Sequence, residues 1–269
     1  MRQVCNLGGG VASTAMFLMA LHGDIDAKVD AAIWADTGWE PRSTHETIHK
    51  LTEYANKFGV SVYTVKATLG NGDIRNAMLD PNSQNGQMPM FTRNKQGKVM
   101  MLHRFCTNEF KVYPIRRLLR SEFKASHDNP VCTWLGYTVE EVKRIKESDV
   151  KYQILRHPLA ENRIYRYDCL EYLKNVGFEF VQRSACVGCP YRKDDEFNIL
   201  SDTEKQELEV FENKLNETGY QMRQGSDERL EVRLHRSMKP ISEHPYKTDS
   251  TASQLTLFDD VCDGGSCWT

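Results

Sequence analysis

Short apolar runs alternate with amphipathic segments along the first part of the chain. The runs at 2–7, 31–36 and 60–65 have the length of strands, whereas 13–21 and 43–58 carry apolar residues at helical spacing. Strands that alternate with helices predict right-handed crossovers and a parallel sheet. We therefore expect an α/β fold, a doubly wound, Rossmann-like parallel sheet with helices on both faces.

The alternation is interrupted and then resumes. Residues 66–101 are rich in Gly, Asn, Gln and Met, which favours a loop that covers a substrate. Beyond it the pattern predicts one strand, at 131–137, and four helices, at 110–123, 138–148, 167–176 and 202–218. We expect residues 1–200 to form the nucleotide-binding domain, and residues 201–269 to form a C-terminal helical extension with a flexible tail.

Composition narrows the class of protein. The chain has 269 residues, a formal net charge of −2 and no apolar stretch long enough to span a membrane, so we expect a cytoplasmic protein with no membrane partner. The charge argues against a surface built for nucleic acid but leaves room for a local basic groove. Eight cysteines in a reducing compartment indicate metal binding or redox chemistry rather than disulfides.

Three glycines follow the first predicted strand, in the stretch LGGGVAST at residues 7–14. A strand that leads through glycines into a helix presents free backbone N–H groups at the positive end of the helix dipole, which is an anion site and most often a phosphate site. The stretch is neither a Walker loop nor a dinucleotide fingerprint. It predicts phosphate contacts from Gly8, Gly9 and Gly10 and from the hydroxyls of Ser13 and Thr14.

This loop resembles the pyrophosphate-binding loop (PP-loop) of the adenine-nucleotide alpha-hydrolase superfamily. WADTGWEPRST (34–44) is similar to the Asp-Thr-Gly stretch of its phosphoadenosine-phosphosulfate (PAPS) reductase-like members, which include enzymes of DNA phosphorothioation and tRNA thiolation. Four further blocks occur in the family's order: RFCTNEFKVYPIRRLL (104–119), WLGYTVEEVKR (134–144), HPLAENRIYRYDCLEYL (157–173) and SACVGCPYR (184–192).

The resemblance implies a site for ATP or for a nucleotide of the adenylyl sulfate type. Asp36 ends the second predicted strand, where open α/β sheets bind nucleotides, and we expect it to hold Mg²⁺ at the phosphates. Gly8 and Ala12 depart from the family pattern, which usually has Ser and often Asp there. The residues implied at the nucleotide are Leu7, Gly8, Gly9, Gly10, Ser13, Thr14, Asp36, Thr37, Gly38, Arg116, Glu141 and Arg144.

Two groups of charged residues have competing interpretations. Arg116, Arg120 and Lys124 share a helix face that either grips a phosphate, a sulfate or a nucleic acid, or is simply solvated. Glu141 and Arg144 either point into the substrate cleft or form an ion pair at i, i+3. Lys111 is our first candidate for a catalytic cation, because it stands in a Cys-x-x-x-x-Lys stretch similar to that of the family.

Cys186 and Cys189 form a Cys-x-x-Cys, and their separation from Cys106 resembles the framework of iron-sulfur sulfonucleotide reductases. Three outcomes are open. The three thiolates hold a [4Fe–4S] cluster with one open iron, His103 completes a closed zinc or cluster site, or the thiols bind no metal. Near the end of the chain, Cys267 is a candidate nucleophile, with the thiol of Cys262 to resolve the intermediate.

Three functions remain. The first is an ATP pyrophosphatase in which Asp36 and Lys111 act while a substrate is adenylated for sulfur transfer; the candidate acceptor is a nucleic acid, and the candidate sulfur donor is a cysteine desulfurase. The second is a reductase of adenylyl sulfate or its 3′-phosphorylated form, in which Cys267 attacks the sulfate. The third is a nucleotide-binding regulator without catalysis. The sequence predicts no oligomeric state.

Overall fold

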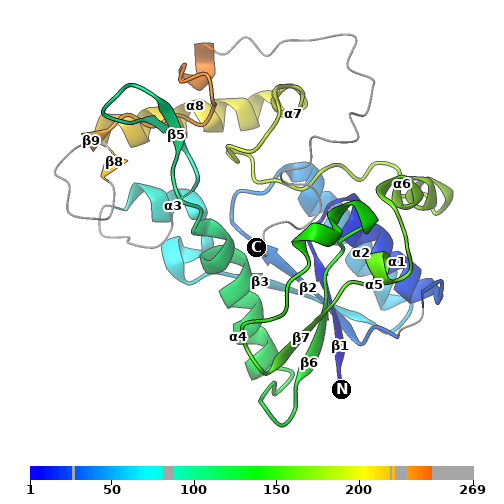
Figure 1. Cartoon of the computed structure of the whole chain (residues 1–269). Coiled ribbons are helices and arrows are strands. Elements are labelled where there is room, and N and C mark those ends of the chain that lie inside the picture. The colour runs from blue at the N-terminus through cyan, green and yellow to red at the C-terminus, as the bar shows by residue number, and fades with distance from the viewer. Residues whose placement is uncertain (26–27, 81–87, 219, 222–228, 244–269) are drawn as a thin grey trace.

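A five-stranded parallel sheet is the centre of the computed structural model, which describes residues 1–25, 28–80, 88–218, 220–221 and 229–243 (Figure 1). Its order is β3-β2-β1-β6-β7, and every neighbouring pair is parallel. The strands are β1 (Gln3–Leu7), β2 (Ala31–Asp36), β3 (Ser61–Lys66), β6 (Val131–Trp134) and β7 (Gln153–Arg156). The sheet confirms the predicted fold class; β7 was not predicted.

Helices cover both faces of this sheet (Figure 1). Successive side chains of a strand point to opposite faces, so Cys5 of β1 joins one core and Val4 the other. The first core contains residues of α1 (Val11–His22), α2 (Arg42–Asn56) and α6 (Arg166–Asn175). The second contains residues of α4 (Tyr113–Ser121).

A further core lies beside the sheet, where we had expected a loop. The segment after β3 forms α3 (Ile74–Leu79) and the hairpin of β4 (Phe91–Arg93) and β5 (Val99–Met101). Met78, Met88 and Met90 are buried in one core with residues of α8 (Asp202–Thr218), so flexible apolar side chains that resembled loop composition are core residues. The proposed division at residue 200 stays a prediction, although α8 contacts α3.

The remaining elements are short. The helix expected over 138–148 is a 3₁₀ turn at Val139–Arg144, and the helix expected from residue 110 begins with a π-helical turn, η2 (Asn108–Val112). The others are α5 (Pro158–Glu161), α7 (Asp194–Asn198), β8 (Tyr220–Gln221), β9 (Arg229–Leu230) and 3₁₀ turns at Leu69–Gly72 and Ile241–Glu243. Among the helices that the structure describes, none is both long and apolar enough to cross a membrane.

The strand order reverses at β1. The chain passes from β1 to β2 on one side and later returns to place β6 on the other side. Open α/β sheets bind ligands outside the carboxyl ends of their strands at such a point, because the connections diverge there. The fold therefore directs attention to the ends of β1 and β6.

Candidate functional site

A pocket lies at this reversal, at the carboxyl ends of β1 and β6, and we call it the central pocket. It joins segments that are far apart in the sequence, from residue 6 to residue 191. Its lining includes Asn6, Leu7, Gly8, Ser13, Trp34, Ala35, Thr37, Ile74, Met88, Arg104, Cys106, Thr107, Lys111, Ile115, Leu135, Gly136, Ser184, Cys186, Cys189 and Tyr191.

The glycine loop is closed largely by its own atoms. Gly8 N–H donates to Ser13 Oγ at 3.0 Å, and the Ser13 hydroxyl donates to Gly10 O at 3.2 Å. Gly9 has φ +76°, and a Cβ there would lie 2.7 Å from Thr44 Cγ2, so both conformation and space require glycine. A ligand at this loop has to exchange these internal hydrogen bonds for its own.

Part of the loop faces away from the pocket. Leu7, Gly8 and Ser13 line it, whereas Gly9, Gly10 and Thr14 are buried outside the lining. Ser184 covers the loop: its hydroxyl donates to Gly8 O, and a Cβ on Gly10 would lie 3.2 Å from Ser184 N. Only half of the six predicted loop residues therefore reach the pocket.

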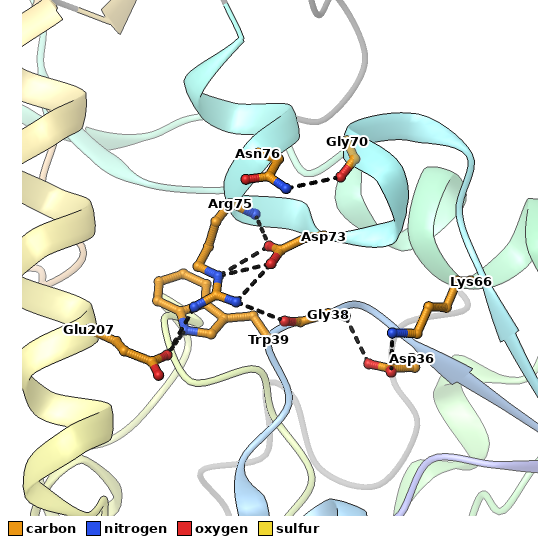
Figure 2. Close-up of polar contacts among 9 residues, drawn as sticks. All are labelled: Asp36, Gly38, Trp39, Lys66, Gly70, Asp73, Arg75, Asn76 and Glu207. Atoms are coloured by element: carbon orange, nitrogen blue, oxygen red, sulfur yellow. Dashed lines mark hydrogen bonds and ion pairs between the residues drawn. The ribbon is translucent and has the colours of Figure 1, made fainter.

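The structure does not bring the Asp36 carboxylate into the central pocket. Thr37 lines the pocket, but Asp36 and Gly38 do not. Asp36 Oδ1 accepts from Gly38 N–H at 2.8 Å, and Oδ2 lies 3.1 Å from Lys66 Nζ (Figure 2). Its negative charge is thus taken up by its own turn and by a cation at the end of β3.

Arg75 holds the turn after β2 from the other side (Figure 2). Its guanidinium donates to Gly38 O at 3.2 Å and forms ion pairs with Asp73 at 2.7 Å and Glu207 at 3.0 Å. Trp39 Nε1 also donates to Glu207, at 3.2 Å. The turn is therefore anchored to α3 and α8, which fixes the position of Thr37.

Three cysteines line the central pocket, as their spacing predicted for a shared site: Cys106, Cys186 and Cys189. The turn that carries the last two is fixed by Arg192, a buried residue that sequence reasoning missed. Its guanidinium donates to the carbonyls of Ala185 at 2.7 Å, Cys186 at 3.0 Å and Val187 at 3.1 Å. Buried carbonyls need such donors, so Arg192 supports the shape of the turn.

Glu40 is the acidic residue at the thiols, and it too was missed. Its side chain is 0% exposed, and its Oε1 accepts from Thr37 Oγ1 at 3.0 Å and from the Cys186 thiol at 3.5 Å. Lys111 Nζ lies 3.5 Å from the same oxygen. Removal from water and the Glu40 charge raise the pKa of Cys186, while Lys111 lowers it. Cys186 is therefore held as a neutral thiol next to a base.

Two cations give the central pocket its electrostatic character. Lys111 is placed there by the π-helical turn η2, and Arg104 lies with its guanidinium carbon 5.7 Å from the centroid of the Tyr191 ring. No Asp or Glu of the described residues belongs to the lining. Cations in a lining favour an anion, and the Glu40 carboxylate 3.5 Å from Lys111 Nζ offsets part of their charge. Because Mg²⁺ takes oxygen ligands, largely carboxylates and phosphates, this lining does not provide the protein ligand that we expected from Asp36.

The predicted cluster or zinc site is not formed by the described residues. No three of their His, Cys, Asp and Glu side chains are arranged to hold a metal ion. His103 is exposed and does not line the pocket. Cys262 and Cys267 lie outside the described residues.

The other predicted nucleotide contacts lie away from the central pocket. Arg116 forms an ion pair with Asp149 and donates to Gln153 Oε1 at 3.1 Å. Glu141 and Arg144 form an ion pair with each other, which was the competing interpretation of their spacing. None of the three lines the central pocket, and their contact with a nucleotide stays a prediction.

Comparison with known proteins gives only distant likeness, among solved structures. No protein-family model matches the chain, and no curated protein matches it. Among solved structures it is similar to the phosphoadenylyl-sulfate (PAPS) reductase from Candida auris in its phosphate complex, with 13% sequence identity and a TM-score of 0.41. The match covers 66% of this chain and 73% of that chain. A likeness at this level does not identify chemistry; the parallel sheet itself establishes the Rossmann-like α/β fold.

Proposed function

We propose that the protein is an enzyme that binds an adenine nucleotide in the central pocket and uses its thiols to reduce an adenylyl sulfate. The observation that carries the proposal is that Cys106, Cys186 and Cys189 line the same pocket as Gly8 and Lys111. Sulfur nucleophiles thus lie beside the glycine loop and a cation. The resemblance of the sequence to PAPS reductase-like proteins supports the same chemistry.

Binding follows from the charges in the lining. Lys111 and Arg104 neutralise the phosphate and sulfate of the nucleotide, and Gly8 and Ser13 contribute hydrogen-bond donors once their mutual contact opens. Positioning the sulfate next to a thiol accounts for much of the expected acceleration, because it makes the reaction effectively unimolecular.

The first step is a transfer of the sulfonate group to Cys186. Glu40 accepts the thiol proton, and the sulfur attacks the sulfate sulfur of the nucleotide. The bond between that sulfur and the bridging oxygen breaks, and AMP, or its 3′-phosphorylated form, leaves with the bonding electron pair. Cys186 then carries an S-sulfonate.

The second step releases sulfite. The thiol of Cys189 loses its proton to solvent and attacks the Cys186 sulfur, so that sulfite leaves with the electron pair and a disulfide joins the two cysteines. The Cys189 N–H donates to Cys186 O at 3.0 Å, which keeps the two residues in one turn. An external dithiol reduces the disulfide and restores the enzyme. Two electrons pass from the two thiols to the sulfate.

A second function is favoured by a different surface, which we call the α4 groove. It is lined by Tyr113, Arg116, Arg117, Arg120, Ser121, Lys124, Ala125, Val150 and Tyr152. Four cations and two tyrosines in an open groove are typical of binding to a nucleic-acid strand. This surface supports the adenylation of a nucleic acid by ATP for sulfur transfer, with a cysteine desulfurase as the donor. The absence of carboxylates from the described lining of the central pocket argues for the reductase first.

Product analysis separates the two functions. The purified protein is incubated with a dithiol reductant and adenylyl sulfate or PAPS, and sulfite is measured; a parallel incubation with ATP and Mg²⁺ measures pyrophosphate. We expect sulfite, with its formation abolished in Cys186→Ser and retained in Cys132→Val, whose thiol is buried in β6 outside the pocket. Pyrophosphate without sulfite would support the second function. A Cys267→Ser variant shows whether the tail thiol takes part.

A further inference from the structure

A buried asparagine in the central pocket has no hydrogen-bond partner. Asn6 lies in β1, two residues before Gly8, and is only 5% exposed. Neither its Nδ2 nor its Oδ1 has a partner within the described structure, although the side chain lines the pocket. Sequence reasoning gave no sign of this residue, because its lack of a partner depends on the segments that fold around it.

A second polar group in the same pocket is also unpaired. Thr107, which precedes η2, is 4% exposed, and its hydroxyl likewise lacks a partner in the described part of the chain. Burying an amide or a hydroxyl without a hydrogen bond is unfavourable, so native proteins rarely leave such groups unpaired. Two of them in one pocket indicate a ligand that supplies the missing partners.

The surroundings indicate what that ligand group is. The pocket lining also contains apolar side chains, among them Ala35, Ile115 and Leu135, and the charged groups of the lining are Arg104 and Lys111. Asn6 and Thr107 are neutral, so they recognise the positions of hydrogen-bond donors and acceptors on a ligand rather than its charge. A neutral, flat group with a donor and an acceptor suits an apolar lining that holds a few polar groups.

We propose that Asn6, together with Thr107, recognises the purine base of the bound nucleotide and selects adenine. A carboxamide presents a donor and an acceptor side by side, and the 6-amino group and N7 of adenine present the complementary pair. Oδ1 accepts from the 6-amino group while Nδ2 donates to N7. This proposal rests on the proposed function, in which an adenine nucleotide occupies the pocket.

Selectivity follows from the same geometry. Hypoxanthine has an oxygen in place of the 6-amino group, so it presents two acceptors along that edge and leaves Asn6 Oδ1 opposite another acceptor. A site built around a hydrogen bond strongly rejects a ligand that cannot form it, because its buried polar group then stays unpaired. We expect AMP to bind about 10- to 100-fold more tightly than IMP.

Calorimetric titration with AMP and IMP tests the assignment without any catalytic step. Wild type is compared with Asn6→Leu, with Thr107→Val and with the control Thr133→Val. Thr133 is a buried polar residue of β6 that does not line the pocket and whose hydroxyl accepts from Gln153. We expect the preference for AMP to disappear in Asn6→Leu, to weaken in Thr107→Val and to persist in Thr133→Val.

The outcomes distinguish this inference from the proposed function. If wild type binds AMP and IMP equally, or if Asn6→Leu keeps the preference, the assignment of Asn6 is wrong while nucleotide binding stands. If wild type binds neither nucleotide, both proposals fail. Asn6→Leu should melt no lower than wild type without ligand, because it removes two unpaired polar atoms. The wild-type comparison needs no variant and so does not depend on whether one folds.

Discussion

The central pocket and the α4 groove both contain charged side chains, but those at the pocket are buried or half-buried whereas most of those in the groove are exposed to solvent. Behind the lining of the pocket, Glu40 is withdrawn from water, and Nζ of the lining residue Lys111 lies 3.5 Å from its carboxylate oxygen. In the groove, Arg117 and Arg120 are exposed to solvent; Arg117 donates to Lys66 O at 3.1 Å, and Arg120 lies over the Tyr152 ring at 5.9 Å. A charge in water is already solvated, whereas a buried one depends on its partners. The pocket is therefore where single substitutions should matter most.

The largest effect is expected for Glu40, the base that contacts the pocket residue Cys186. Glu40→Gln keeps the shape of the side chain but cannot accept the Cys186 proton, so turnover with adenylyl sulfate should fall by about 100- to 10,000-fold. The loss should shrink at high pH, where solvent removes the proton. Glu46→Gln is the control, since Glu46 pairs with Arg42 on the exposed side of α2. Equal rates for both variants at neutral pH would remove Glu40 from the mechanism.

Next in size is the loss of a pocket cation. Lys111→Met should weaken AMP binding by about 10- to 100-fold, since a hydrogen bond to a charged group contributes roughly 1.5–3 kcal/mol. Arg120→Met in the α4 groove should change it by less than about 3-fold, because exposed charges contribute little. Titrations at two salt concentrations check this ranking. Should Arg120→Met weaken AMP binding more than Lys111→Met does, the nucleotide has been placed in the wrong region.

A smaller effect, on the stability of the protein, is expected at Gly188, which packs against Trp39 next to the turn of Cys186 and Cys189. A Cβ on Gly188 would overlap the Trp39 ring, so Gly188→Ala should lower the free energy of unfolding by about 1–3 kcal/mol. Gly10→Ala is the matched comparison: its Cβ would lie 3.2 Å from Ser184 N, a contact that a small shift relieves. Urea denaturation measures both variants. A larger loss for Gly10→Ala would mean that the Cys186 turn adjusts more easily than the glycine loop.

The smallest effect is a pH dependence outside both regions. Burial lowers the pKa of His157 below its ordinary 6.5, partly offset by Glu161, and its ring stacks on Tyr137 at 5.3 Å. The unfolded chain takes up the proton first, so stability should fall as the pH drops below about 6.5. His157→Phe keeps a stacking ring and should flatten that fall, whereas the exposed His49→Phe should not. Denaturation curves at several pH values measure how the free energy of unfolding changes with pH. The same pH dependence in wild type and in His157→Phe would show that His157 is not its cause.

The sequence was informative where local pattern decides the structure. Alternating apolar runs predicted the strands β1 to β3 and their helices. The spacing of Cys106 from Cys186 indicated one shared site, and both residues line the central pocket. The strand β7 was not predicted, because its four residues, QILR, contain only two apolar residues between two polar ones.

What could not be predicted depends on contacts between distant segments. Asp36 ends a strand as expected, but its carboxylate direction is set by Lys66, a residue of another strand. Glu40 gains its significance only when the turn of Cys186 folds against it, 146 residues later. Asn6 is unusual only because the segments around it offer it no partner. Spacing gives positions along one element, whereas these properties arise only when distant segments fold together.

Protection of thiols by nucleotide tests the central claim most directly. The full chain is treated with a limiting alkylating reagent, with and without AMP, and the labelling of each cysteine is followed by mass spectrometry. We expect AMP to slow the labelling of Cys106, Cys186 and Cys189, which line the central pocket, and to leave any slow labelling of Cys132 unchanged. Unchanged labelling of all three pocket cysteines at saturating AMP would contradict the placement of a nucleotide beside them.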